Sequence, residues 1–527
     1  MPIKKLDSIF RPKRIAIIGL SNDPNSVGSL TLKNLVGGGF QGVVYPINPN
    51  REAVMGIPCY PNIESLPKKP DLAVIMTAAK QVPEIIVNCG KAGINGVIVM
   101  SAGFKESGEK GKLLEVKLKK QIDKFPDMRV IGPNCLGVIV PKAKLNLSFA
   151  NGMPRQGKVA FISQSGALCA SVLDWADDTK IGFSYFISIG NAVDVTFGDL
   201  IDYLGQDTNT KSIILYVESL ANARSFMSAA RAFARKKPII VYKSGRFPES
   251  AAVAASHTGA LASEDAIYDA VFRRAGLARV YDIGNIFDIT DLVGRKRIPK
   301  ATGLAIVTNA GGPGVMATDT IISLGGRLEP LSEETMSKLN QLLPPYWSHG
   351  NPIDVLGDAT PKRVSQAISI VLNDKYIDAV LIILTPQAMT NPTAIAEAIV
   401  EISAQTSKFI MAAWLGGTSM HKGLDILTSA EIPVYNTPEQ AMRSFMTMTQ
   451  YMKNLELLYE TPKDVPVAFN YDRESLREKY IGRIFRKSKV LSEDDSKLLI
   501  NDYGISTTHP ELALTEDDAV DIANRKG

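Results

Sequence analysis

Short apolar runs alternate with longer amphipathic segments along most of this chain. The runs are rich in Ile, Val and Leu, and Gly, Pro or Asn residues bound many of them. Strand-like runs that alternate with helix-like segments are typical of parallel α/β sheets, because a crossover between parallel strands usually contains a helix. The pattern therefore predicts an α/β fold.

The apolar runs fall into three groups, and each group predicts one doubly wound parallel sheet. The first group predicts strands at residues 14–20, 42–48, 71–76, 96–101 and 129–134. The second predicts strands at residues 158–163, 212–218, 238–244 and 278–283. The third predicts strands at residues 304–309, 379–386, 409–416 and 433–438. Residues 452–488 are highly charged and predict a surface linker with a helix, after which a new segment begins.

Composition narrows the class of protein. The chain has 527 residues, which exceeds what one core can organise and indicates several domains. Its formal net charge of +5 is too small to predict nucleic-acid binding, although it tolerates an anionic substrate. No window approaches the ~18 uncharged apolar residues of a membrane span, and the N-terminus has no apolar signal core. Four widely spaced cysteines without a CxxC pair predict reduced thiols, so we expect a cytoplasmic protein with no membrane partner.

Residues 251–265 place His257 in a run of small residues. Such a run has little apolar surface to anchor it, and Gly259 adds backbone freedom, so the segment predicts a mobile loop. Near neutral pH an imidazole offers a nucleophilic nitrogen that can hold and release a phosphoryl group. His257 is therefore a candidate phosphohistidine, with capping or packing of the following helix as the alternative.

A glycine turn follows the first predicted strand. Gly19 ends that strand and Gly28 precedes a helical stretch, an arrangement that lets backbone N–H groups approach a phosphate at a helix N-terminus. The spacing is not GxGxxG, and the second strand ends at Asn48 and Arg51 instead of an acidic residue that would bind a ribose. An arginine there suits a phosphorylated ligand better than NAD. The alternative is an ordinary structural turn.

Two further segments share one strand-to-helix pattern. Residues 158–176 and 303–321 each run from a buried strand through small and polar residues into an amphipathic helix. Such a turn leaves free N–H groups at the positive end of the helix dipole, which favours anions. Each segment is a candidate anion site, although either one alone could be an ordinary strand-to-helix turn.

Seven motifs follow one another along the chain: the Gly19–Gly28 turn, IGPNCLG (131–137), SQSGAL (163–168), YVES (216–219), SHTGALA (256–262), TNAGGPG (308–314) and NPIDVLGD (351–358). Together, and in this order, they resemble one known family, the ADP-forming acyl-CoA synthetases, which belong to the NDP-forming superfamily and are related to succinyl-CoA synthetase. The resemblance implies a Rossmann-like CoA-binding domain and two flavodoxin-like ligase domains, followed by a linker and the start of an ATP-grasp domain. The implied boundaries are 1–145 for the CoA-binding domain, 146–298 for the ligase domain with the phosphohistidine loop, 299–450 for the second ligase domain, 451–488 for the linker and 489–527 for the incomplete ATP-grasp domain.

The resemblance also implies roles for individual residues. His257 would carry the phosphoryl group, and Glu218 would orient it by accepting a hydrogen bond from its Nδ1, which leaves Nε2 to attack. Two helix N-termini would bind phosphate through Ser165, Gly166, Ala167, Gly311, Gly312 and Gly314. The implied CoA-binding residues are Gly19, Ser21, Gly28, Asn48, Arg51 and Asn134.

The implied activity is the interconversion of a short-chain carboxylic acid, ATP and CoA with acyl-CoA, ADP and phosphate, through an acyl phosphate and a phosphohistidine. The acid is expected to be acetate or a hydroxy acid such as 3-hydroxypropionate or 4-hydroxybutyrate. ATP, ADP and Mg²⁺ would bind an ATP-grasp domain of which residues 489–527 resemble only the opening helix and strand. The remainder would lie on the same or another polypeptide, in a homo- or hetero-oligomer, and no metal site is expected in this chain.

Two other functions are compatible with parts of the sequence. One is a regulatory module that senses acyl-CoA without catalysis, but such family members typically lack the phosphorylatable histidine. The other is an NAD-linked oxidoreductase built on the first domain, which the missing acidic residue after the second strand weakens.

Overall fold

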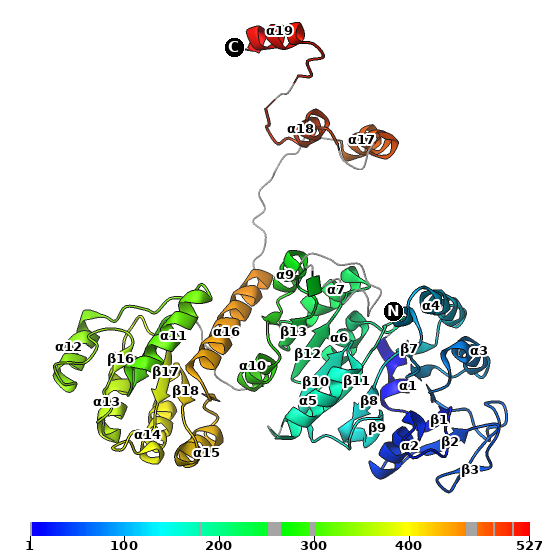
Figure 1. Ribbon diagram of the computed structural model, residues 1–527, viewed down its shortest axis with the longest axis horizontal. Helices are drawn as coiled ribbons and strands as arrows, with labels where there is room; N and C mark the ends of the chain where they lie inside the picture. Colours follow the sequence, from blue (N-terminus) through cyan, green and yellow to red (C-terminus); the bar gives the residue numbers. More distant parts are fainter. Residues whose placement is uncertain are drawn as a thin grey trace. The chain divides into compact units, whose positions relative to one another are not determined.

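The computed structural model describes residues 3–178, 181–247, 249–250, 265–294, 302–459, 472–487, 491–508 and 511–526. The chain divides into two compact units, residues 1–459 and residues 460–527. The first unit contains three α/β sheets in succession along the chain (Figure 1), which confirms the predicted fold class. No helix in the described ranges is long and apolar enough to cross a membrane.

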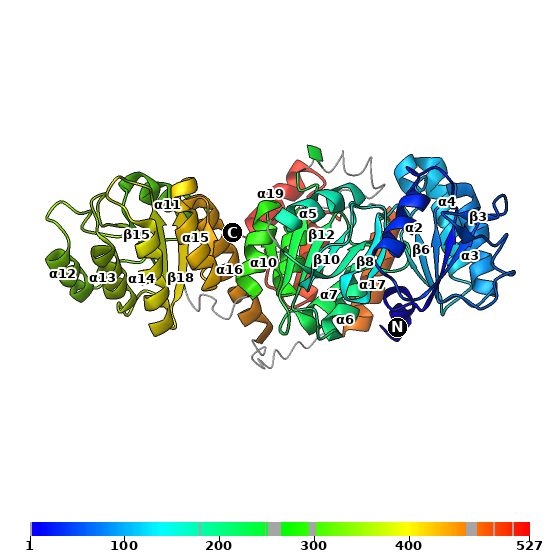
Figure 2. The ribbon, with the colours of Figure 1, turned by 90° about the horizontal axis from the view of Figure 1, so that it is seen from below.

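The first sheet is parallel throughout and has five strands. In spatial order they are β2 (Val43–Ile47), β1 (Arg14–Ile18), β5 (Leu72–Ile75), β6 (Gly96–Val99) and β7 (Arg129–Ile131). One face packs against α1 (Asp7–Phe10) and α2 (Val27–Gly37), and the other against α3 (Val82–Lys91) and α4 (Glu109–Ile122). Figure 2 shows α2 and α3 on opposite sides of this sheet. A short hairpin of β3 (Ala53–Val54) and β4 (Ile57–Pro58) follows β2.

The second sheet has seven strands, of which five form a parallel set and two extend it through antiparallel pairings. In spatial order they are β14 (Ala278–Val280), β13 (Ile239–Lys243), β12 (Ser212–Val217), β10 (Gln156–Ser163), β11 (Phe183–Ser188), β8 (Gly137–Val140) and β9 (Leu145–Ser148). One face packs against α6 (Phe197–Gln206), α7 (Ala223–Phe233) and α9 (Asp265–Arg274), and the other against α5 (Gly166–Asp178) and α10 (Gly284–Gly294).

Strands β8 and β9 lie before the expected domain boundary at residue 145, or across it, yet they extend the second sheet. The first and second sheets therefore separate between β7 and β8. The buried core is also continuous across this junction, since residues of α1 and α2 share one apolar cluster with residues of α6 and α7.

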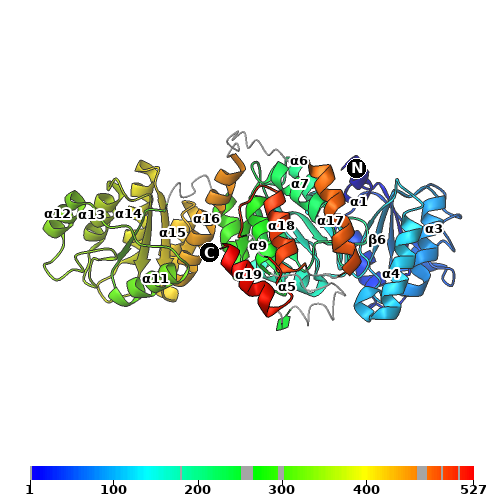
Figure 3. The ribbon, with the colours of Figure 1, turned by 90° about the horizontal axis from the view of Figure 1, so that it is seen from above.

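The third sheet again has five parallel strands. In spatial order they are β16 (Ile353–Asp354), β15 (Leu304–Thr308), β17 (Ala379–Leu384), β18 (Phe409–Trp414) and β19 (Val434–Tyr435). One face packs against α11 (Gly311–Ser323) and α16 (Pro438–Tyr459), and the other against α12 (Glu333–Leu342), α13 (Pro361–Leu372), α14 (Pro392–Gln405) and α15 (His421–Ser429). Figure 3 shows α12, α13 and α14 on the side away from α16.

Helix α16 joins the second and third sheets. Its Asn454 side chain donates to the Leu277 carbonyl at 2.9 Å, and Gln440 Nε2 donates to both carboxylate oxygens of Asp288 at 3.0 and 2.9 Å. Residues 451–459, the start of the expected linker, are the last part of this helix, and Tyr451 is buried there.

The second unit contains three helices in its described residues: α17 (Arg473–Lys487), α18 (Glu493–Asp502) and α19 (Glu516–Lys526). Tyr480 and Lys479 of α17 each donate to Asp502 of α18 at 2.6 Å. The strand expected within residues 489–527 does not occur in the described part of that segment.

All three sheets use the same parallel order, in which the first strand lies between the second and the third. This order has a switch point between the first and third strands, where the chain leaves the two strands toward opposite faces. Ligands of open α/β sheets bind outside the carboxyl ends of the strands at such a point. The topology therefore predicts ligand sites at the carboxyl ends of three strand pairs: β1 and β5, β10 and β12, and β15 and β17.

Candidate active site

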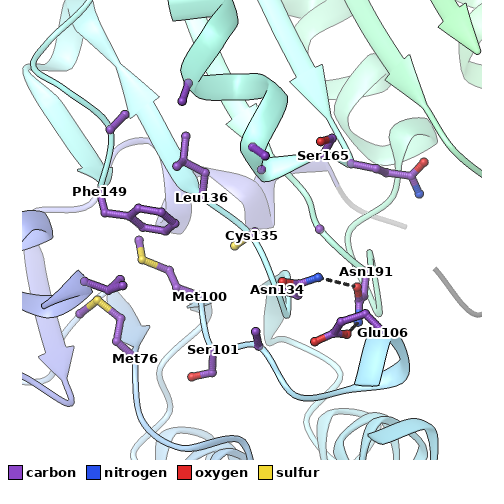
Figure 4. Close-up of a pocket in the computed structure, with 18 of the residues that line it drawn as sticks. Met76, Met100, Ser101, Glu106, Asn134, Cys135, Leu136, Phe149, Ser165 and Asn191 are labelled. Carbon is purple, nitrogen blue, oxygen red and sulfur yellow. Dashed lines mark hydrogen bonds between the residues drawn. The ribbon is translucent and has the colours of Figure 1, made fainter. Parts of the chain in front are cut away.

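A pocket of about 840 Å³ opens at the carboxyl ends of strands from both the first and the second sheets. Figure 4 shows its lining, with side chains from loops after β6, β7, β9, β10 and β11. Five of the sequence-predicted site residues lie in this lining: Asn134, Ser165, Gly166, Ala167 and Glu218. Segments that are far apart in the sequence thus meet at one cavity, as strand-end turns of parallel sheets do.

One side of the pocket is polar. Asn191, in the turn after β11, donates from its single amide nitrogen to Glu106 at 2.8 Å and to Glu115 at 2.7 Å. Asn134 donates more weakly to Asn191 Oδ1, at 3.5 Å. Lys105 donates to the Asn191 carbonyl at 3.0 Å, so the turn is held through both its side chain and its backbone.

The backbone of this polar side is closely constrained. Asn134 has a φ of +57°, and a Cβ on Gly190 would lie 2.2 Å from the Asn134 carbonyl oxygen. Only glycine permits so close an approach of two backbones. The turns after β7 and β11 therefore pack against each other directly at the pocket floor.

The opposite side of the pocket is apolar. Its lining includes Val27, Met76, Met100, Leu136 and Phe149, and Figure 4 shows the two methionines grouped with Phe149 and Leu136. Methionine and phenylalanine side chains suit an elongated ligand of low polarity, because methionine fills irregular space. The pocket therefore combines one apolar wall with one wall of hydrogen-bonding groups.

Helix α5 points its N-terminus at this pocket. Ser165 is its N-cap, since its hydroxyl accepts from the Leu168 N–H at 3.3 Å. Ser163 Oγ holds the turn by donating to the Ser165 carbonyl at 2.9 Å and accepting from the Ser165 N–H at 3.0 Å. The first helical turn leaves N–H groups without intrahelical partners and carries a partial positive charge, which favours an anion.

Glu218 follows β12, next to the turn that follows β10. Gln164 Oε1 accepts from the backbone N–H groups of Glu218 at 2.7 Å and Ser219 at 3.0 Å. The Glu218 backbone is therefore fixed to the first residue after β10. This is the switch point of the second sheet.

Charged and phenolic groups surround Glu218. Burial raises the pKa of Tyr216, and the carboxylate of Glu218 raises it further. Burial lowers the pKa of Lys243, which is only 4% exposed, while the carboxylates of Asp265 and Glu218 oppose that effect. Glu218 thus lies in a field that includes a buried ammonium group at the end of the neighbouring strand β13.

The first glycine turn lies at the carboxyl edge of the first sheet. Gly19 has a φ of +97°, and a Cβ there would lie 2.8 Å from the Met76 carbonyl. A Cβ on Gly28 would lie 3.1 Å from the Gly19 carbonyl oxygen, so turn and helix α2 are in close contact. Ser21 Oγ donates to Ser26 Oγ at 2.9 Å, which shapes the loop before α2.

The second strand of the first sheet ends beside this turn. Asn48 Nδ2 donates to the Leu20 carbonyl at 2.6 Å and so connects the two turns. Arg51 is exposed, and no hydrogen bond or ion pair involves its side chain among the described residues. Its guanidinium is accessible to an anionic ligand. Gly19, Ser21, Gly28, Asn48 and Arg51 do not line the pocket themselves, although Val27, the neighbour of Gly28, does.

The structure of this region fits a CoA-like ligand. First, any side chain at Gly19 would fill the space at this turn, and α2 supplies a helix N-terminus as the second feature. Third, an apolar wall continues from Val27 into the pocket. A pyrophosphate needs the first two features and a pantetheine arm needs the third. CoA has both groups.

The turn after β15 repeats the geometry of the turn after β10. Thr308 Oγ1 donates to the Ala310 carbonyl at 2.8 Å and accepts from the Ala310 N–H at 3.1 Å. Helix α11 then begins at Gly311, with Gly312 and Gly314 in its first turn, but none of these three glycines lines the pocket. A Cβ on Gly311 would lie 3.3 Å from Asp354 Oδ2, so a carboxylate already faces this helix N-terminus.

His257 lies in residues 251–264, outside the described residues, so its predicted role stays a prediction. Within the described ranges, no group of three or more His, Cys, Asp and Glu side chains could hold a metal ion.

The polar pocket residues that the sequence analysis did not single out include Lys105, Glu106, Asn191 and Gln164. Asn191 follows β11, whose serines interrupt the apolar run and hid the strand. Glu106 lies in a short 3-10 helix (Lys105–Ser107) that follows β6, and its position after a predicted strand was the available signal.

Comparison with known proteins identifies three domains in the same order. Residues 13–141 match the CoA binding domain, residues 156–293 the succinyl-CoA ligase like flavodoxin domain, and residues 304–453 the ligase-CoA domain. The matches account for the three sheets of the first unit.

Curated relatives align along nearly the whole chain. The ADP-forming acetate–CoA ligase I of Archaeoglobus fulgidus is 35% identical over 522 residues, which are 99% of this chain and 74% of the relative. The ADP-forming 4-hydroxybutyrate–CoA ligase of Nitrosopumilus maritimus is 33% identical over 523 residues, which are 98% of this chain and 74% of the relative.

A solved structure has the same architecture. The dinucleotide-forming acetyl-coenzyme A synthetase 1 of Ca. Korarchaeum cryptofilum, in complex with phosphate and ADP, is 35% identical with a TM-score of 0.76. The match covers 86% of this chain and 98% of that one. The chain therefore belongs to the family of ADP-forming acyl-CoA synthetases and is an acid–thiol ligase.

Proposed function

We propose that this chain interconverts a short-chain acyl-CoA and phosphate with CoA and a phosphohistidine at His257, as its part of an ADP-forming acid–CoA ligase reaction. The observation that carries the proposal is the meeting of Asn134, the N-terminus of α5 and Glu218 at one pocket. The pocket joins the CoA binding domain to the succinyl-CoA ligase like domain. The catalytic relatives support this activity over a module that only senses acyl-CoA.

The first step joins phosphate to the acyl group. CoA would lie with its phosphates at the Gly19–Gly28 turn and Arg51, and its thioester in the pocket. Phosphate would bind the N-terminus of α5 through Ser165, Gly166 and Ala167. A phosphate oxygen attacks the thioester carbonyl carbon, the C–S bond breaks, and the thiolate takes a proton as CoA leaves. The product is an acyl phosphate.

The second step moves the phosphoryl group. Nε2 of His257 attacks phosphorus, the bond between phosphorus and the acyl oxygen breaks, and the carboxylate leaves. Glu218 would accept a hydrogen bond from Nδ1 and so stabilise the positive charge that forms on the imidazole. The N–H groups of α5 would stabilise the charge on the equatorial phosphoryl oxygens. Gly311, Gly312 and Gly314 of α11 are proposed to contact the phosphoryl group as a second helix N-terminus.

The third step transfers the phosphoryl group from His257 to ADP. We assign ADP, ATP and Mg²⁺ to an ATP-grasp domain of which residues 489–527 would be the beginning, on this or another polypeptide in an oligomer. The Korarchaeum relative is described in complex with phosphate and ADP, which supports the use of ADP by the assembled enzyme. The four free cysteines and the substrates favour the cytoplasm as the compartment.

The carboxylic acid substrate belongs to a small group of short-chain acids. Relatives named as acetate–CoA and 4-hydroxybutyrate–CoA ligases support a short acid with or without a terminal hydroxyl. Acetyl-CoA, 3-hydroxypropionyl-CoA and 4-hydroxybutyryl-CoA are therefore the substrates to compare.

The test is covalent labelling. The chain is incubated with each acyl-CoA and radiolabelled inorganic phosphate, and the label is mapped by proteolysis. We expect an acid-labile, base-stable label on His257 that requires both reagents. His257→Ala should abolish it, whereas the matched Ser256→Ala variant should keep it. A label that survives in His257→Ala would contradict the proposal.

A further inference from the structure

The hydrogen-bond partners of the Gln164 side-chain amide determine which of its terminal atoms is the oxygen. One terminal atom of this amide lies 2.7 Å from the Glu218 backbone nitrogen and 3.0 Å from the Ser219 backbone nitrogen. Both backbone groups are donors, so the atom between them must be the acceptor, Oε1. The usual ambiguity between oxygen and nitrogen in an amide is therefore absent here.

The amide nitrogen of Gln164, Nε2, is available to a ligand. Gln164 lines the pocket, and its Nε2 makes no hydrogen bond with any residue in the described ranges. Nε2 is not among the buried polar atoms that lack a partner, so it is accessible. A fixed amide thus presents two N–H donors beside the N-terminus of α5.

The third sheet provides an internal comparison. Asn309 follows β15 as Gln164 follows β10, and Asn309 Oδ1 accepts from the Thr385 N–H at 2.9 Å. There, however, the amide nitrogen is used: Asn309 Nδ2 donates to the Thr385 carbonyl at 3.0 Å and to Thr390 Oγ1 at 3.2 Å. Asn309 is also buried, with 3% exposure. The amide nitrogen is therefore hydrogen-bonded in the third sheet and accessible in the second, and we call Gln164 the open copy of this turn.

The open copy lies at the switch point between β10 and β12, next to Ser165 and Glu218. A preorganised donor at such a point is worth most where negative charge develops, since it needs no reorganisation during the reaction. The transferring phosphoryl group is the negatively charged species proposed for this pocket.

We propose that Gln164 is a catalytic residue with two roles. Its Oε1 fixes the backbone of Glu218 and Ser219, and its Nε2 donates to an oxygen of the phosphoryl group during transfer to His257. This inference rests on the proposed function and adds a donor from a side chain to the backbone donors of α5.

Two variants separate the two roles. Gln164→Glu keeps an oxygen that can accept from Glu218 and Ser219 but replaces the N–H donors with a carboxylate oxygen. Gln164→Met has a similar length and removes both acceptor and donors without adding charge. The assay is the single-turnover rate at which the full chain acquires label from radiolabelled inorganic phosphate in the presence of acetyl-CoA, measured over a range of phosphate concentrations. If acetyl-CoA is not a substrate, the acyl-CoA that labels the wild type replaces it.

If Nε2 is a transition-state donor, both variants should lose about 10²–10³-fold in the labelling rate constant at saturating phosphate, the usual effect of removing one such donor. CoA affinity by calorimetry and the thermal midpoint of Gln164→Glu should stay close to wild type. A wild-type rate in either variant overturns the inference. The inference is also overturned if a variant keeps the wild-type maximal rate and only needs a higher phosphate concentration to reach half of it. For Gln164→Glu that result would indicate charge repulsion alone.

The proposed function fails in a different way. If wild-type chain releases no CoA and acquires no label with any acyl-CoA, the activity itself is wrong. If wild type is active and Gln164→Glu matches it, the activity stands and Gln164 only supports the backbone.

Discussion

Asn191 donates a hydrogen bond to Glu106 across the junction of the first two sheets, at 2.8 Å. The second proton of the same amide goes to Glu115 at 2.7 Å. Asn191 is 9% exposed and follows β11, whereas both carboxylates belong to the first sheet's loops and helices. One side chain therefore closes the polar side of the pocket by joining two domains.

Asn191→Ala should destabilise this junction. Each lost hydrogen bond to a charged group is worth about 1.5–3 kcal/mol, and truncation leaves two carboxylates close together without their donor. We expect a lower thermal midpoint and weaker acyl-CoA binding, measured by calorimetry. Asn151→Ala, at an exposed position of the same pocket, is the matched control and should leave the midpoint unchanged.

The effect of Asn191→Ala should depend on pH. Burial alone would raise the pKa of Glu106, but hydrogen bonds from Asn191 and the backbone N–H groups of Phe104 and Gly103 lower it below its ordinary value. A lowered carboxyl pKa contributes stability above the ordinary pKa of about 4.3, and that stability is lost as pH falls through the folded-state pKa. The difference in thermal midpoint between wild type and variant should therefore shrink below about pH 4. A constant difference would contradict the role of ionised Glu106.

Glu218→Gln should impair phosphoryl transfer without affecting CoA binding. In the proposed mechanism an imidazolium forms at His257, and a neutral amide cannot stabilise it as a carboxylate does. Positioned acid–base partners contribute about 10²–10⁴-fold. Single-turnover labelling gives the rate, and calorimetry gives the CoA affinity. Wild-type turnover in this variant would remove Glu218 from the mechanism.

Arg51→Ala should weaken CoA binding. The guanidinium is exposed at the edge where Gly19 and Asn48 meet, and a charge-assisted contact to phosphate is worth about 1–3 kcal/mol, which is roughly 5–150-fold in Kd. Because the proposed phosphate site lies at α5 and not at Arg51, the rate at saturating acyl-CoA should change little. NAD should not bind the wild type, and tight NAD binding without CoA binding would favour the dehydrogenase alternative.

The cysteines should differ in reactivity. Burial raises the pKa of the Cys89, Cys135 and Cys169 thiols to about 12, so almost no thiolate forms near pH 8. Cys59 is partly exposed, although burial raises its pKa too. With iodoacetamide under native conditions, mass spectrometry should find Cys59 modified first. Early modification of Cys135 would indicate that the pocket opens more widely than this structure does.

Local sequence predicted most strands because a buried parallel strand reads as a continuous apolar run. Strand β11 was missed because Ser184 and Ser188 interrupt the run. In the structure both serines are buried, since Ser184 Oγ pairs with Thr210 Oγ1 at 2.9 Å and Ser188 Oγ accepts from the Leu136 N–H at 3.0 Å. A hydroxyl with a partner costs little to bury, and that partner is visible only after folding.

Strands β8 and β9 show the same limit at the level of domains. They follow the first sheet in sequence, and nothing local distinguishes a strand that closes one sheet from a strand that opens the next. The pairing of Phe186 with Ile139 in antiparallel register assigns them to the second sheet. Such pairing joins residues distant in the chain, so it is a property of the tertiary structure.

The sequence by itself determined the α/β class and the strand-end turns at Gly19, Ser165 and Gly311, because apolar runs, small residues and helix starts are local features. Only the tertiary structure decided which of these turns share a cavity: it brings the turn after β10 to Asn134, Asn191 and Glu218, and leaves the turn after β15 facing Asp354. The physical reason is strand order. A turn's neighbours at the sheet edge are set by which strands pair, and those pairs are remote in the sequence.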